Sequence, residues 1–246
     1  MIEIGYSMPS AAPFYPEGPY EFRDCWWVVV VFKSTSETLR ELVPQPLEPN
    51  ADNTMVALVG SLHAAGLGPY HEAIIAVPAR FQDLSGRYNV YLYVDNDAAT
   101  ACGREIWGYP KKGARFSAIE SSETVRYTVE RGGVQIIGAS VVLADLAKPE
   151  ELVPPLPVFN LKVIPSVKQG APPDVQQLTV TTLENYRVKR AYKGNATVEF
   201  GMSPADPLHR IKVEQIVAGY YVQTDCDLTY GDVLYDYLTG EARASG

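Results

Sequence analysis

The most informative stretch of this sequence is Gly103-Arg104-Glu105-Ile106-Trp107-Gly108-Tyr109-Pro110-Lys111-Lys112. It places two adjacent lysines directly behind an aromatic segment that contains a proline. A free lysine is protonated near neutral pH because its reference pKa is about 10.4, and only the neutral amine attacks a ketone to form a Schiff base. Apolar surroundings and a neighbouring cation both lower a lysine pKa. The stretch therefore predicts a nucleophilic lysine.

The two causes differ in size. If the segment is extended, consecutive side chains point to opposite faces, which holds the two ammonium groups on the order of 10 Å apart. At an effective dielectric of about 20 that repulsion amounts to roughly 1.7 kcal/mol. Lowering a lysine pKa by roughly three to four units costs about 4 to 5.5 kcal/mol, so desolvation has to supply the larger share. We therefore expect one lysine to project into a closed apolar cavity while the other stays nearer water.

Composition bounds the class of protein. The chain has 246 residues, of which 46% are hydrophobic, enough to bury a sizeable core. Its 21 basic and 29 acidic residues give a net charge of −8, and such a balance argues against nucleic acid as a partner. With no repeat and no convincing linker, we expect a single domain over residues 1–246.

The pattern of apolar and turn residues predicts many strands and few helices. A first helix is expected after Ser34, with Glu37 completing a capping box and Pro44 as the stop. A second is expected over residues 97–102, capped by Asp95 or Asn96 and ended by Gly103, and a third over 232–238. Strands are expected over residues 26–33, 56–62, 72–79, 88–94, 115–119, 124–130, 134–143, 160–164, 177–191, 197–200 and 212–227.

This content predicts a mainly β (α+β) fold, an antiparallel sheet curled into a cone-like barrel with a few short helices. A barrel interior is a natural place for a dry, closed pocket.

The lysine segment resembles the signature of the acetoacetate decarboxylase family, a Gly-Arg-Glu followed by an aromatic residue, Pro, Lys and Lys. Further matches follow the family's order along nearly the whole chain: Gly18-Pro19-Tyr20, Val43-Pro44-Gln45-Pro46-Leu47, Gly66-Leu67-Gly68-Pro69-Tyr70 with Glu72, Asp95-Asn96 and Val233-Leu234-Tyr235-Asp236-Tyr237-Leu238. The resemblance implies that Lys111 forms the Schiff base, that Lys112 is the adjacent perturbing lysine, and that Glu72 is an acidic active-site residue.

Two charged positions of the family are replaced here. An arginine at the head of the first long strand falls on Cys25, and a second active-site glutamate falls on Ala57. Arg23 lies two residues before Cys25 and would share its face on a regular strand, so it could substitute in part.

The remaining candidates come from the lysine segment itself. Arg104 either holds a substrate carboxylate or neutralises the end of its helix. Tyr109 and Trp107 would help to desolvate the lysine and wall the pocket. The candidate substrate-binding residues are thus Arg104, Arg23, Tyr109 and Trp107.

The resemblance implies a lyase that decarboxylates a β-keto acid through an iminium on Lys111, with no metal or organic cofactor, built as a cone-like β barrel in a homo-oligomer. Because the two charged positions differ, a Schiff-base aldolase or dehydratase acting on pyruvate or another 2-keto acid stays open. A third alternative is a non-catalytic barrel that binds small carbonyl compounds.

The sequence shows no targeting signal, no membrane span and no metal-ligand spacing. The first twenty residues show neither a basic start nor a continuous apolar core, and the longest apolar run, residues 25–32, is too short to span a bilayer. The three cysteines show no metal or disulfide spacing, and neither do the three histidines. We therefore expect a cytoplasmic protein with no metal site and no membrane partner.

Overall fold

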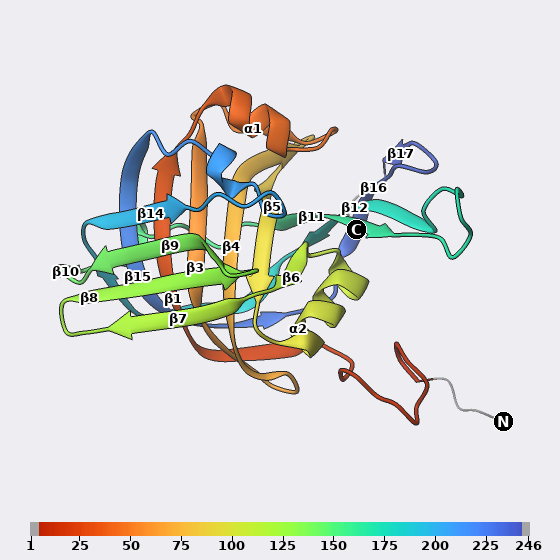
Figure 1. Ribbon diagram of the computed structural model, residues 1–246, viewed down its shortest axis with the longest axis horizontal. Helices are drawn as coiled ribbons and strands as arrows, with labels where there is room; N and C mark the ends of the chain where they lie inside the picture. The colour runs from red at the N-terminus through yellow and green to blue at the C-terminus, as the bar shows by residue number, and fades with distance from the viewer. Residues whose placement is uncertain (1–4, 243–246) are drawn as a thin grey trace.

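The computed structural model describes residues 5–242 and contains two β-sheets (Figure 1). The large sheet runs, in spatial order, through β10 (Asp145–Leu146), β13 (Leu183–Lys193), β15 (Gln215–Leu228), β1 (Tyr20–Lys33), β3 (Thr54–Ala64), β4 (Gly68–Phe81), β5 (Leu84–Val94), β11 (Val158–Ile164), β12 (Val175–Thr181), β16 (Asp232–Asp236) and β17 (Glu241–Ala242). Two short strands lie off this path, with β2 (Glu48–Pro49) on β4 and β6 (Lys111–Gly113) on β5.

The small sheet has the order β14 (Ala196–Phe200), β9 (Val134–Val142), β8 (Thr124–Arg131) and β7 (Arg115–Glu120). The helices are α1 (Ser36–Leu42) and α2 (Asp97–Cys102), together with a π-helical turn η1 (Gly103–Trp107) and two 3₁₀ turns, η2 (Pro149–Glu151) and η3 (Leu208–Arg210).

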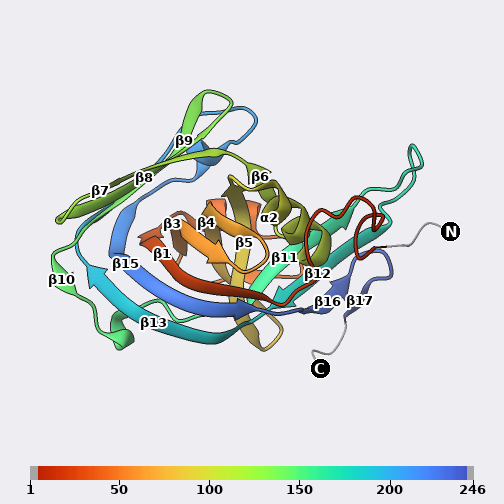
Figure 2. The same cartoon turned by 90° about the horizontal axis from the view of Figure 1, so that it is seen from below.

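The predicted fold class is confirmed, because strands dominate and most pairings are antiparallel. The large sheet curls round on itself, as Figure 2 shows from below, but its path runs from β10 to β17 without closing into a barrel. It is also mixed, since β5 pairs in parallel with both β6 and β11.

The central strands bury both of their faces. On β3, Val56 and Leu58 belong to one hydrophobic cluster, and Ala57 and Val59 belong to the other. A strand covered on both sides reads as a continuous apolar run, as residues 55–60 do. The small sheet packs across one face (Figures 1 and 2), and the other face lines a cavity that contains Lys111.

Helix α1 begins one residue later than predicted. Its N-cap is Thr35, whose hydroxyl accepts a hydrogen bond from the backbone N–H of Thr38 at 3.1 Å. Ser34, the predicted cap, precedes Thr35 and is fully buried. Helix α2 is capped by Asn96, as predicted, through the backbone N–H of Ala99. The predicted end is confirmed as well, since Cys102 is the last residue of α2 and Gly103 is its C-cap, and the chain then continues as the π-helical turn η1.

The predicted helix over residues 232–238 is wrong. Residues 232–236 form strand β16, which pairs with β12, and burial alternates along it from Val233 to Asp236. Valine and tyrosine suit a pleated, half-buried surface, and β12 offers that surface an unpaired edge. The predicted strand over 177–191 divides into β12 and β13 at Thr182.

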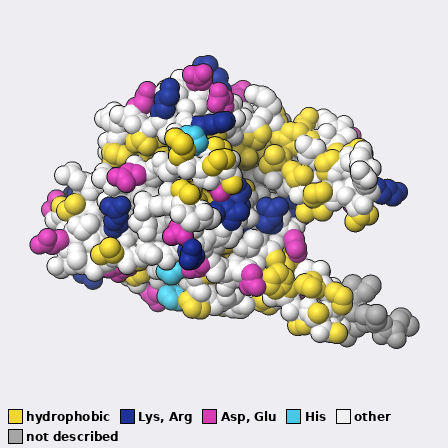
Figure 3. All heavy atoms as spheres, viewed as in Figure 1, with side chains coloured by type: hydrophobic (Ala, Val, Ile, Leu, Met, Phe, Trp, Pro, Cys, Tyr) yellow, Lys and Arg dark blue, Asp and Glu magenta, His cyan; other side chains and the backbone are white. Residues whose placement is uncertain are grey.

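On the face drawn in Figure 3, acidic and basic side chains are interspersed rather than gathered by sign. Within the described part of the chain, no helix combines the length and the apolar character that a membrane crossing requires.

Candidate active site

The backbone that carries Lys111 leaves β5, turns through α2 and η1, and returns beside β5 as β6. Gly108 ends η1 with φ of 80°, a left-handed conformation that glycine adopts without a steric penalty. The N–H of Tyr109 then donates to the carbonyl of Gly103 at 3.0 Å. This turn sets Lys111 in register with Leu92, on the face of the sheet that lines the cavity.

Gly103 makes room for the lysine side chain. A Cβ at this position would lie 2.6 Å from Cδ of Lys111, closer than real Cβ atoms approach other atoms. The first glycine of the motif therefore lets the lysine stem lie directly against the helix backbone, which fixes where its amine ends.

The Lys111 amine lies 2.9 Å from Oε2 of Glu72, and each residue is only 7% exposed. By distance this is a buried ion pair. Its angles are not those of a hydrogen bond, since Oε2 of Glu72 accepts none from the described residues. The amine also lies over the rings of Tyr70 and Tyr109, 5.6 and 5.7 Å from their centroids. The structure thus brings Lys111, Glu72 and Tyr109 together, as predicted.

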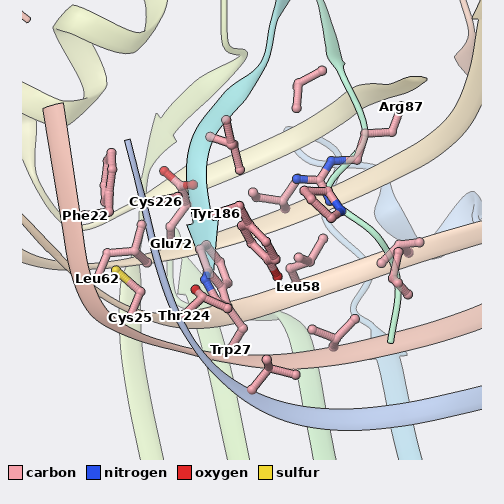
Figure 4. A pocket seen from close by; sticks show the side chains of 18 of the residues that line it. Phe22, Cys25, Trp27, Leu58, Leu62, Glu72, Arg87, Tyr186, Thr224 and Cys226 are labelled. Atoms are coloured by element: carbon pink, nitrogen blue, oxygen red, sulfur yellow. The ribbon is translucent and has the colours of Figure 1, made fainter. Parts of the chain in front are cut away.

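The pair faces a cavity whose empty space, together with the open solvent at its mouth, amounts to about 1140 Å³ (Figure 4). Most of its lining is apolar or aromatic, contributed by β1, β3, β4, β13 and β15 and by the segment at residues 152–155. Burial raises the pKa of Cys25 to about 11 and that of Cys226 to about 12, and both thiols line this cavity. Burial also raises the pKa of Tyr109 to about 12, although its hydroxyl bonds Thr181 at 3.0 Å. These groups are therefore shielded from water by a mostly apolar lining.

Lys112 points to the opposite face of β6. Its amine lies 2.8 Å from Oδ1 of Asp206, a carboxylate that is fully buried and also bonds Nε of Arg131 and the hydroxyl of Tyr93, each at 3.0 Å. The Lys112 side chain is 38% exposed. The structure therefore separates the two lysines, in keeping with the expected alternation.

Two of the predicted substrate-binding residues lie outside the cavity. Arg23 is paired with Glu21 and Asp227 on the surface, because a bulge between Phe22 and Cys25 breaks the alternation that would have put Arg23 on the face of Cys25. Arg104 is exposed on η1. Its neighbour Glu105 accepts a hydrogen bond from Tyr15.

Trp107 is buried but is a structural anchor rather than part of the cavity lining. Its indole N–H donates to the carbonyl of Thr229 at 3.0 Å, and its own carbonyl accepts from the Thr179 hydroxyl at 2.6 Å. Of the two replaced positions, Cys25 lines the cavity, whereas Ala57 faces the cluster on the other side of the sheet.

Sequence reasoning missed Arg87. This residue lies on β5, lines the cavity and is only partly exposed. The available signal was the pair Arg87 and Asn89, two polar residues spaced by two within an otherwise apolar and aromatic strand. Asp206 was missed as well, because it lies in a loop with no local pattern.

Residues 5–242 show no group of three or more His, Cys, Asp or Glu side chains arranged to hold a metal ion.

Comparison with known proteins shows the family of this chain. A family model described as acetoacetate decarboxylase (ADC) matches residues 4–238. An acetoacetate decarboxylase of Ralstonia nicotianae is 30% identical over 240 residues, covering 96% of each chain.

Solved structures give the same result for the fold. The crystal structure of acetoacetate decarboxylase from Legionella pneumophila matches with a TM-score of 0.88 and 29% identity, over 95% of this chain and 94% of that one. The enduracididine biosynthesis enzyme MppR complexed with pyruvate shares the fold at a TM-score of 0.79 with 17% identity, over 90% of this chain and 92% of that one. The buried lysine, the fold and these matches lead to one conclusion: the chain belongs to the acetoacetate decarboxylase family and is an acetoacetate decarboxylase-like lyase.

Proposed function

We propose that this protein decarboxylates a β-keto acid, acetoacetate or a larger relative of it, through a Schiff base on Lys111. One observation carries the proposal. A lysine amine and a carboxylate lie 2.9 Å apart, both nearly inaccessible to water, at the wall of an apolar cavity.

The first step is the release of a neutral amine. An apolar cavity disfavours both an ammonium and a carboxylate, and their attraction across 2.9 Å offsets only part of that cost. Moving one proton from the lysine to Glu72 turns two buried charges into two neutral groups. The freed amine attacks the ketone carbon of the substrate, and loss of water gives the iminium.

The second step breaks the carbon–carbon bond. The pair of electrons from the bond to the carboxylate carbon moves into the iminium and forms an enamine, while the carboxylate leaves as carbon dioxide. The enamine carbon then takes a proton, for which the Glu72 carboxyl is the nearest donor, and water hydrolyses the new iminium to a ketone and free Lys111. The iminium is itself the electron sink, so this route uses no metal or organic cofactor.

The other predicted site residues receive narrower roles in this proposal. The ring of Tyr109 lies beside the Lys111 amine and shields it from water. Lys112 is a positioning residue, because its bond to Asp206 fixes β6 from the opposite face. Its charge is countered by that carboxylate, which weakens the repulsion expected between the two lysines.

The proposal is tested by trapping with borohydride. The protein is incubated with acetoacetate or, separately, with pyruvate, then reduced, and the modified peptide is mapped by mass spectrometry while carbon dioxide release is measured. We expect an adduct on Lys111 and carbon dioxide from acetoacetate. An adduct on another residue contradicts the proposed mechanism.

The same experiment separates the alternatives. A pyruvate adduct without decarboxylation of acetoacetate would indicate the aldolase or dehydratase chemistry of a 2-keto acid. Binding of carbonyl compounds with no adduct would indicate a non-catalytic barrel.

A homo-oligomer and a cytoplasmic location stay predictions. The first is supported by exposed apolar side chains on the arm built by β11 and β12, where Val163 is 38% and Val167 is 97% exposed, and Figure 3 shows hydrophobic side chains gathered there. Light scattering of the purified chain tests the oligomer.

A further inference from the structure

Arg87 brings an uncompensated positive charge to the cavity. It has no ion pair with any described carboxylate, and its Nε is shielded from water without a hydrogen-bond partner. Burial lowers the pKa of this guanidinium, and the nearby Tyr109, Tyr186 and Glu72 counter that effect only in part. An arginine is charged at all physiological pH values, so it cannot escape the cost of burial by losing its proton.

The guanidinium points into the space that the substrate would fill. In Figure 4 it enters the pocket from the strand that carries Arg87 and lies on a different side of the pocket from Glu72. The charge already present at the other end, on Glu72, is paired with Lys111. The cavity therefore has one positive charge in excess, in a place where an anion would find a planar, bidentate partner.

The register of β5 shows that this anion is not the carboxylate that leaves. On β5, Leu92 pairs with Lys111 and Arg87 pairs with Pro78. One of the residues between Leu92 and Arg87 is taken up by a bulge between Tyr91 and Asn89. The remaining four steps place the two backbone positions roughly 13 Å apart along the strand. Side chains stand roughly perpendicular to a sheet, so most of that separation persists inside the cavity. In a β-keto acid the leaving carboxylate is only two bonds from the ketone carbon.

The wall between the two groups is mostly apolar, with Asn89 of β5 as a polar exception. Ile74 lies on β4 between the positions of Glu72 and Pro78, and Tyr109 and Tyr186 complete this part of the lining. Such a surface suits a hydrocarbon chain rather than a polar one.

We propose that Arg87 binds a second acidic group of the substrate, so that this protein acts on a β-keto acid carrying a further carboxylate several carbons from its ketone. This inference specifies the substrate class of the proposed decarboxylase and rests on that function. The leaving carboxylate stays beside Lys111 and Glu72, while Arg87 holds the far end of the molecule.

The test compares ligands that differ only in the far carboxylate. Octanedioate and octanoate are titrated into the full-length protein by calorimetry, together with the six- and seven-carbon members of each series. We expect the parent protein to bind at least one dicarboxylate tenfold or more tightly than the matching monocarboxylate. In Arg87→Met this ratio should fall to about one, and Arg87→Lys should keep part of it, since lysine keeps the charge and loses the bidentate fork.

The stability of Arg87→Met separates binding from a structural role. Removing an unpaired buried cation should leave the melting temperature of the ligand-free protein unchanged or raise it, and only the dicarboxylate should stabilise the parent more than the variant. Equal binding of mono- and dicarboxylates by the parent overturns the inference. A ratio that is the same in the parent and in Arg87→Met overturns it as well.

The outcome is independent of the proposed function. Binding of saturated dicarboxylates requires no decarboxylation, so a ratio that depends on Arg87 supports the inference even if no β-keto acid is consumed. Conversely, turnover of acetoacetate with no preference for a diacid leaves the decarboxylase proposal intact and removes this one.

Discussion

Lys111 and Lys112 are neighbours in the sequence and each ends in an ion pair, but the two pairs lie on opposite faces of β6. Lys111 meets Glu72 in a mostly apolar cavity, with both residues 7% exposed and no aligned hydrogen bond on Oε2 of the carboxylate. Lys112 meets Asp206, which also bonds Arg131 and Tyr93, and its own side chain is 38% exposed.

The difference lies in how well each carboxylate is satisfied. Asp206 accepts three hydrogen bonds, so its charge is stable where it is and holds three elements together. Oε2 of Glu72 is close to its lysine but accepts no aligned hydrogen bond, so this carboxylate is less fully satisfied than that of Asp206. The proposed roles follow this difference, with the well-satisfied pair assigned to the fold and the less satisfied pair, in an apolar cavity, assigned to the chemistry.

The largest expected effect comes from exchanging each lysine for arginine. Lys111→Arg keeps a positive charge but cannot form a Schiff base, so we expect kcat to fall by about 10⁴ or more, together with all borohydride-dependent labelling. Lys112→Arg should keep labelling within a few-fold of the parent, because arginine can still pair with Asp206. Equal losses in both variants would contradict the division of roles.

Glu72→Gln tests the proton transfer inside the reactive pair. The amide is of similar size but accepts no proton from Lys111, so we expect kcat to fall roughly 10²- to 10³-fold, the range typical of a general acid–base group. A variant that keeps full activity at neutral pH would remove Glu72 from the mechanism.

Gly103→Ala tests the placement of the amine without changing its chemistry. The added methyl would lie 2.6 Å from Cδ of Lys111, and the flexible lysine stem is the part that must move. We expect kcat to fall roughly tenfold to 100-fold, as displacements of about 1 Å do, with KM and melting temperature nearly unchanged. The control is Gly113→Ala, where a Cβ meets nothing within 4 Å.

Asp206→Asn probes the satisfied pair and should act on stability rather than on chemistry. Burial raises the pKa of Asp206, but hydrogen bonds from Lys112 and Tyr93 and the charges of Lys112 and Arg131 outweigh burial, so the net pKa is lowered. A carboxyl group with a lowered folded pKa contributes stability above its unfolded pKa of about 3.9 and loses that contribution as the pH falls through the folded value.

The expected loss for Asp206→Asn is about 2 kcal/mol in the free energy of unfolding at pH 7, with kcat within a few-fold of the parent. In denaturant titrations the difference between the two proteins should shrink below about pH 4, where the parent's carboxylate takes up its proton. A difference that stays constant down to pH 2 would mean that the ion pairs of Asp206 contribute nothing.

The sequence predicted the fold class and much of the element order because both depend on local patterns. Apolar runs such as residues 55–60 mark strands buried on both faces, and Asn96 caps α2 in the way its side chain favours. The failures occurred where an edge or an irregularity decided the outcome. Residues 232–236 became a strand because β12 had a free edge, and a bulge turned Arg23 away from the face of Cys25.

For the site, the lysine motif by itself pointed to Lys111, and alternation along a strand by itself indicated that Lys112 would face elsewhere. Which carboxylate each lysine meets was decided by tertiary structure, because Glu72 lies 39 positions before Lys111 and Asp206 lies 94 positions after Lys112. Arg87 shows the same limit. Its position in β5 is local, but its lack of a counter-ion depends on every strand that surrounds the cavity, and only the folded chain brings those strands together.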